Sequence, residues 1–140
     1  MAAGFYNEES SGFAVEPAFM DFNLNFQPRQ IVCLEHAGTC LYAEVIQVVV
    51  SRSLCWVRPL VVGVFPTGFQ YDQPSPLYDL RLGADLLWPV TLFRPALDTE
   101  VIPLLTQLLA LEPPLERDPV AQQQLNQFIH QVWQAHPDAF

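Results

Sequence analysis

Two cysteines and a histidine within a short stretch are the first candidates for chemistry in this 140-residue chain. Cys33, His36 and Cys40 carry the thiols and the imidazole that a zinc site or a thiol enzyme requires. Cys33 and His36 are three residues apart in strand-like sequence, so they point to opposite faces and cannot converge on one metal ion. If residues 37–38 form the turn, Cys40 lies opposite Glu35 and shares the face of Cys33. This spacing predicts no metal site, and a thiol enzyme using Cys40 and His36 stays an alternative function.

The charge balance narrows the classes of partner. The formal charge is −9, from 15 acidic residues against six arginines and no lysine. Proteins that bind nucleic acid or anionic membranes draw affinity from cationic side chains, so neither partner is expected. The sequence holds no glycine-rich phosphate loop and no nucleophile-elbow motif, so we expect no cofactor and no catalytic activity. Another protein or a peptide is the expected partner.

Two echoing runs, LCWVRPL (54–60) and TLFRPAL (91–97), place an arginine directly before a proline. Proline cannot donate to a β-ladder, so each proline is expected at a sheet edge, a bulge or a strand end. Alternation puts Trp56 and Arg58 on one face of the strand. If that face is the outer one, the two side chains could bind an acidic peptide. An inner position would require a carboxylate partner such as Asp79. The acidic composition favours this second arrangement, and it favours the same neutralising role for Arg94.

Aromatic side chains are more numerous than a small β-fold needs inside. Trp, Tyr and Arg dominate the energetics of protein interfaces, and several aromatics fall in the proline-containing loop 65–78. Trp56 and Phe128 are expected in the core. The predicted partner-binding residues are Trp56, Arg58, Phe65, Phe69, Tyr71, Tyr78, Trp88 and Arg94.

The elements that must position these residues are strands followed by helices. Alternation, β-branched residues and turn signals predict five strands, at residues 30–36, 39–50, 54–64, 77–82 and 90–95. Residues 83–89 are expected to form a turn or a 3₁₀ step. A helix after Asp98 or Thr99 is predicted to bury Val101, Ile102, Leu105, Leu108 and Leu109.

A second helix is predicted to start at Asp118 and Pro119, since aspartate accepts from the first amides and proline has no amide to leave unpaired. Its expected apolar stripe is Ala121, Leu125, Phe128, Ile129, Val132 and Trp133. Its opposite face is rich in glutamine, which leaves dimerisation through this helix as a further alternative function.

The domain organisation follows from these elements. Residues 1–28 form an acidic, aromatic segment that is a docking tail, an extension or a fused peptide, residues 29–97 a β-barrel, and residues 98–140 a helical part that packs on it. No apolar run approaches the roughly 18–20 residues that span a bilayer, and the N-terminus does not read as a secretory signal. Three cysteines suggest free, buried thiols in a reducing compartment, so a cytoplasmic location is expected.

The order of five strands, with a long loop and a 3₁₀-like step before the last, resembles SH3-like small barrels. The lysine-free segments YDLRLGADLLWP and LFRPALDTEVIPLL are similar in composition to sequences of small cyanobacterial proteins. In those proteins, such barrels recur as accessory subunits of photosynthetic complexes. We therefore expect an α+β protein with a five-stranded SH3-like antiparallel β-barrel followed by two amphipathic helices. The expected function is a non-catalytic protein-binding module, an assembly factor or accessory subunit of a photosynthetic or carbon-fixation complex.

Overall fold

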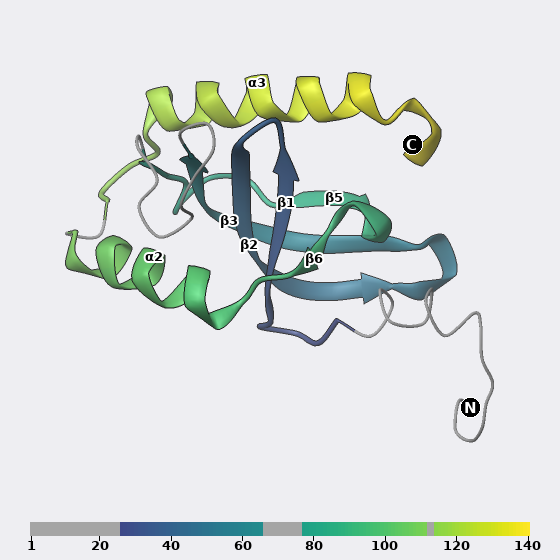
Figure 1. Ribbon diagram of the computed structural model, residues 1–140, viewed down its shortest axis with the longest axis horizontal. Coiled ribbons are helices and arrows are strands. Elements are labelled where there is room, and N and C mark those ends of the chain that lie inside the picture. Colours follow the sequence, from purple (N-terminus) through teal and green to yellow (C-terminus); the bar gives the residue numbers. More distant parts are fainter. Residues whose placement is uncertain (1–25, 66–76, 112–113) are drawn as a thin grey trace.

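The computed structural model describes residues 26–65, 77–111 and 114–140, which form an α+β fold (Figure 1). Predictions for residues 1–25, and for Phe69 and Tyr71, lie outside the described residues. Figure 1 shows α3 along one side of the sheet and α2 on the other. The strands are β1 (Ile31–His36), β2 (Thr39–Val49), β3 (Leu54–Val64), β4 (Leu77–Asp79), β5 (Leu86–Pro89) and β6 (Arg94–Pro95). The helices are α2 (Asp98–Ala110) and α3 (Pro119–Ala135), with 3₁₀ turns η1 (Val50–Arg52), η2 (Val90–Leu92) and η3 (Pro137–Ala139).

The strands form one antiparallel sheet in the order β4-β3-β2-β1-β6, with β5 also paired to β3. The α+β class is confirmed, and the first three predicted strands are present. The sheet has six strands rather than five and is not closed in the described part of the chain, so closure into a barrel is not confirmed. Residues 83–89, expected as a turn, contain β5, and the expected strand 90–95 is η2 followed by the two-residue β6.

The predicted turn between β1 and β2 is confirmed. Ala37 and Gly38 have φ values of 50° and 80°, the positive values at both turn residues that a type I′ hairpin requires. This turn fixes the register in which Glu35 pairs with Cys40 and Cys33 pairs with Tyr42. The two cysteines therefore share a face, as the sequence predicts.

A bulge in β3 explains the first Arg-Pro step. Ala43 of β2 pairs with Pro59, but the preceding Tyr42 pairs with Val61, so one extra residue is inserted after the proline. The missing amide of Pro59 is tolerated at this irregularity, and Pro95 ends β6, so both prolines lie where the sequence analysis expects them. Before the bulge Cys55 and Val57 are buried, and after it neighbouring residues are buried on both faces.

The sheet carries a hydrophobic core on each face. The core on the α3 side includes Val32, Leu34, Leu41, Ala43, Val45, Cys55, Val57, Val62, Leu80, Phe93 and four residues of α3. The core on the α2 side contains Cys33, Cys40, Tyr42, Val61, Phe65 and Leu104. Strands β1 and β2 contribute to both cores, so the two helices rest on one shared layer.

Helix α3 follows the sequence prediction closely. Asp118 Oδ1 accepts hydrogen bonds from the amides of Val120 at 2.9 Å and Ala121 at 3.3 Å, and Pro119 occupies the first helical position. The predicted stripe is buried at Ala121, Leu125, Phe128 and Val132. Trp133, at the end of the stripe, is 52% exposed.

Helix α2 forms where predicted but presents a different face to the sheet. Val101, Leu104 and Leu108 are buried, whereas Ile102 and Leu109, expected inside, are exposed. This difference in the buried face is explained by Glu100, whose buried carboxylate contacts Tyr42 of the sheet. The contact orients α2 so that Val101, Leu104 and Leu108 face inward. Among the described residues, neither helix has the length and apolar character needed to cross a membrane.

Candidate functional site

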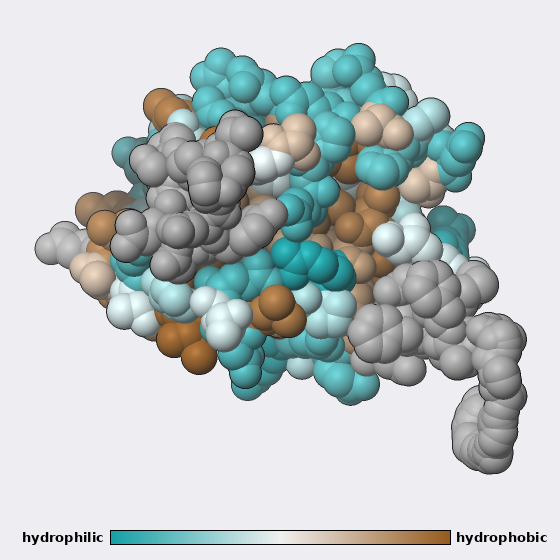
Figure 2. Space-filling model, viewed as in Figure 1, coloured by the Kyte–Doolittle hydropathy of each residue, from teal (hydrophilic) through white to brown (hydrophobic). Residues whose placement is uncertain are grey.

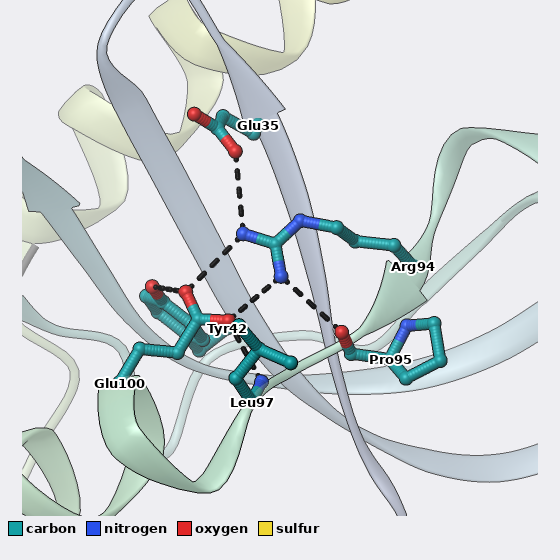
Figure 3. A network of polar contacts seen from close by, with 6 residues as sticks. All are labelled: Glu35, Tyr42, Arg94, Pro95, Leu97 and Glu100. Atoms are coloured by element: carbon teal, nitrogen blue, oxygen red, sulfur yellow. Dashed lines mark hydrogen bonds and ion pairs between the residues drawn. The ribbon is translucent and has the colours of Figure 1, made fainter.

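Arg94 lies in a polar network that fastens α2 to the sheet (Figure 3). Its Nη1 donates to Glu100 Oε2 at 2.7 Å, and its Nη2 donates to Glu100 Oε1 and to Glu35 Oε1, both at 3.2 Å. Tyr42 Oη donates to Glu100 Oε1 at 2.7 Å, and the Leu97 amide donates to Oε2 at 2.7 Å. Both oxygens of a carboxylate that is only 5% exposed are thereby satisfied.

The electrostatics of this Glu100 network keep the carboxylate ionised. Burial alone raises the pKa of Glu100, but hydrogen bonds from Arg94, the Leu97 amide and Tyr42 outweigh it and lower the pKa below the ordinary value. Burial, followed by the hydrogen bond to Glu100, raises the pKa of Tyr42 far above its ordinary range. Arg94 therefore neutralises carboxylates, as the sequence analysis expects, and its role in partner binding stays a prediction.

Trp56 and Arg58 share the outer face of β3, joined by one carboxylate. Trp56 Nε1 donates to Asp85 Oδ2 at 3.0 Å, and Arg58 Nε donates to Asp85 Oδ1 at 3.3 Å. Trp56 is 39% exposed, so its expected place in the core is wrong. The expected Arg58–Asp79 pair is also wrong, because Asp79 binds Arg81 at 2.8 Å.

The pairing of β5 accounts for this correction. Leu87 of β5 pairs with Trp56, and Leu86 pairs with Val57, which brings the preceding Asp85 beside Arg58. This pairing could not be anticipated from a segment predicted to be a turn. Trp56 and Arg58 are brought together as expected, but on an exposed face and with a different acidic partner.

The loop residues proposed for binding do not form one described surface. Phe65, expected on the loop surface, is instead buried in the core on the α2 side. Tyr78 is half-buried and packs against the core on the α3 side. Phe69 and Tyr71 lie outside the described residues. Trp88, another of the predicted partner-binding residues, lines a hollow on the surface.

Trp88 lies in a hollow of about 410 Å³ between β5 and α3, which we call the aromatic groove. It is lined by Trp88, Asn126, Ile129, His130, Trp133 and Phe140. Trp88 and Phe140 meet edge to face with ring centroids 5.0 Å apart, and His130 and Trp133 lie 6.3 Å apart. Trp133 belongs to the core stripe expected from the sequence, and no role is predicted for Phe140. The sequence feature that could have indicated the exposure of Trp133 is its position at the end of the stripe, where α3 approaches its last residues.

The three thiols are buried in the two hydrophobic cores: Cys33 and Cys40 lie in the core on the α2 side, and Cys55 lies in the core on the α3 side. Cys33, Cys40 and Cys55 are free and fully buried. A hydrogen bond with Cys40, together with burial, raises the pKa of Cys33, and burial raises the pKa of Cys55 to about 11. His36 lies with its ring centroid 6.4 Å from that of His136. Among the residues that the structure describes, no three histidine, cysteine, aspartate or glutamate side chains are placed to hold a metal ion.

We expect all three thiols to resist iodoacetamide in the folded protein at neutral pH, because alkylation requires an accessible thiolate. The same treatment in concentrated urea should label all three, and intact-mass spectrometry counts the added groups. Rapid labelling of one thiol in the folded protein would contradict this expectation and would favour the thiol-enzyme alternative with Cys40 and His36.

Comparison of the chain with models of protein families, with curated proteins and with solved structures gives no match. Among the described residues, the aromatic groove that joins Trp88, Trp133 and Phe140 is the candidate functional site.

Proposed function

We propose that this protein is a non-catalytic protein-binding module that receives an apolar or aromatic side chain of its partner in the aromatic groove. It acts as an accessory subunit or assembly factor of a larger complex. The main observation in support is that Trp88 and Trp133 line one hollow of about 410 Å³. These two residues come from a strand and a helix that are far apart in sequence. Ligand hollows of about 300–1,000 Å³ take drug-sized groups or a few side chains.

The composition of the groove supports this proposal. Interface hot spots are enriched in tryptophan and lie in pockets that exclude water. Trp133 is half-exposed although it is large and apolar, and its exposure creates a wall on which a partner ring can pack. Phe140 lines the hollow and meets Trp88 edge to face, so the wall of the groove already presents aromatic surface.

An SH3-like small barrel is the finer fold that we propose. In support, the path from β6 through β1 and β2 to β3 ends in two short strands on β3, and η2 lies directly before β6. The strands β4 and β5 together take the place of the single fourth strand of the expected meander. A role in a photosynthetic or carbon-fixation complex follows from the resemblance of the sequence to cyanobacterial accessory proteins.

The proposal is tested by comparing two tryptophan variants from opposite faces. The immobilised protein is used to capture a stoichiometric partner from a native lysate, and the affinity of that partner is then measured by calorimetry. Trp133→Ala is expected to weaken binding by about 30-fold or more, the loss of about 2 kcal/mol that marks a hot spot. Trp56→Ala, which truncates an exposed tryptophan outside the groove, is the matched control and should bind within about twofold of the unmodified protein.

Other outcomes contradict specific parts of the proposal. Loss of binding in Trp56→Ala alone would move the binding surface to the face that holds Arg58 and Asp85. Equal binding by both variants would remove the aromatic groove from the function. Failure of the unmodified protein to retain any stoichiometric partner would count against a protein-binding module.

A further inference from the structure

Strand β2 continues beyond the start of β1 and leaves an open edge of the sheet. The register of β1 with β2 begins at Glu44, and hydrogen bonds of Val45 with the backbone of residues 29–30 extend the pairing by one position. On its other side, β2 stays paired with β3 as far as its last residue. In the part of the chain that the structure describes, no strand pairs with residues 46–49 on the β1 side. We call this stretch the β2 edge.

The β2 edge is suited to pairing with another strand. Its four residues, IQVV, include no charged residue and no proline, the side chains that commonly keep an open edge from pairing. Val45 and Val48 both pack against the core on the α3 side, and residues on one face of a strand direct their N–H and C=O groups to the same edge. Because Val45 bonds toward β1, the backbone groups of Val48 also point out of the β2 edge.

The N-terminal segment joins the described part of the chain beside the β2 edge. Arg29 N donates to Val45 O at 2.7 Å. Figure 1 shows residues 26–30, in dark purple, running from the start of β1 toward the end of the molecule where β2 and β3 meet. Phe26 is 5% exposed and lies in the core on the α3 side, against which Val48 also packs. The residues before Phe26 therefore start close to the β2 edge and on a known face of the sheet.

The sequence before Phe26 has the pattern of a strand that fits this position. Phe22, Leu24 and Phe26 alternate with polar residues, and an extended backbone places all three on one face. The burial of Phe26 identifies that face as the α3 side. Figure 2 shows hydrophobic surface below α3, so the helix does not cover all the apolar surface on its side of the sheet. Val48 is only partly buried there, and apolar side chains beside it would complete its cover.

Charge favours this segment over a second copy of the chain. Residues 1–25 contain four acidic residues and no basic one. Two of the six arginines, Arg29 and Arg52, are exposed at the start of β1 and in η1, which follows β2 directly. An acidic segment along the β2 edge lies between these two cations. Pairing with a second copy would instead bring together two chains that each carry a net charge of −9.

We propose that residues 21–25 of this chain pair with the β2 edge as a further antiparallel strand, with Phe22 and Leu24 on the α3 side. The direction follows from the attachment, because the chain runs toward Val45 while β2 runs away from it. A strand of a partner protein can pair with this edge only after it displaces the segment. The proposal does not depend on the aromatic groove, whose lining residues all lie outside β2.

The test is solution NMR of the full chain. We expect cross-strand nuclear Overhauser effects between backbone protons of residues 21–25 and residues 46–49. The Val48 amide should exchange with deuterium at least about 100-fold more slowly than in an unstructured peptide, because it is hydrogen-bonded in the pairing. The Leu41 amide, in the core, reports global unfolding and should keep its rate in every variant below.

Two proline variants and a matched control complete the test. Neighbouring amides of a strand point to opposite edges, so either Asn23→Pro or Leu24→Pro removes an amide that bonds to β2. That variant should speed the exchange of the Val48 amide by at least about tenfold. Ser11→Pro, the same kind of substitution earlier in the segment, should leave the exchange unchanged.

Three results would overturn the proposal. The first is exchange of the Val48 amide in the unmodified protein as fast as in an unstructured peptide. The second is slow exchange that depends on protein concentration and that neither Asn23→Pro nor Leu24→Pro changes, which would assign the edge to a second copy. The third is slow exchange that is independent of both concentration and these variants, which would assign it to another part of the chain. None of these measurements bears on the aromatic groove, so the two proposals fail separately.

Discussion

Replacing Glu100 by alanine is expected to lower the free energy of unfolding by about 3 kcal/mol. The substitution leaves the Tyr42 hydroxyl without its acceptor in a buried position and removes the carboxylate at 2.7 Å from Arg94. Arg94 keeps its contact with Glu35 and is partly exposed, so the loss stays below that of a fully buried ion pair. Urea unfolding followed by tryptophan fluorescence measures the change.

Two further variants separate the network from helix propensity. Tyr42→Phe removes one hydrogen bond and should cost about 1–2 kcal/mol. Asp98→Ala changes an exposed acidic residue in the same helical turn and should cost less than about 1 kcal/mol. If Glu100→Ala cost no more than Asp98→Ala, the network would not be what holds α2 on the sheet.

The contribution of Glu100 also depends on pH in a defined direction. The pKa of its carboxyl is lower in the folded protein than its ordinary value of 4.5, so the folded state takes up this proton less readily than the unfolded state. The stabilisation is therefore fully present above about pH 4.5 and is lost as the pH falls toward the lower folded-state value. The stability difference between the unmodified protein and Glu100→Gln should shrink between about pH 6 and pH 3. A constant difference across this range would contradict the assignment.

Phe128→Ala is expected to destabilise the protein by about 3–5 kcal/mol, because it removes a ring from the core between α3 and the sheet. Phe128 is 2% exposed and belongs to the same core as Val32, Leu41 and Val57. Trp133→Ala, on the same helix but at a half-exposed position, should cost less than about 1 kcal/mol. Thermal and urea unfolding of both variants provide the comparison. Similar losses for the two would mean that α3 is held through its exposed aromatic edge rather than its buried stripe.

The elements that could be predicted from the sequence are those specified by local signals. The β1–β2 hairpin combines alternation with the Ala37-Gly38 turn, and α3 combines an aspartate cap, a proline and a regular stripe. The strands β4, β5 and β6 have two to four residues each, too few to show a period, and they are defined by pairing with β3 and β1. Alternation identified Trp56 and Arg58 as sharing a face, but it could not say which face is outside.

The face of α2 and the aromatic groove depend on contacts between distant residues. Leucines at 104, 105, 108 and 109 make two rotations of α2 nearly equal in hydrophobicity, and the contacts of Glu100 with Tyr42 and Arg94 decide between them. The groove joins Trp88, Trp133 and Phe140 from three separate parts of the chain. No local pattern links these positions, because the packing of α3 over β5 creates their proximity.

The two-residue strand β6 has a consequence for the way the chain folds. Its pairing with Val32 and Cys33 joins positions near 32 and 95, and such distant closure costs considerable chain entropy for few hydrogen bonds. The pairing cannot persist alone, but Arg94 of β6 also binds Glu100 at the start of α2. We therefore expect the hairpins β1–β2 and β2–β3, which join neighbouring segments, to form before β6 and α2 attach together.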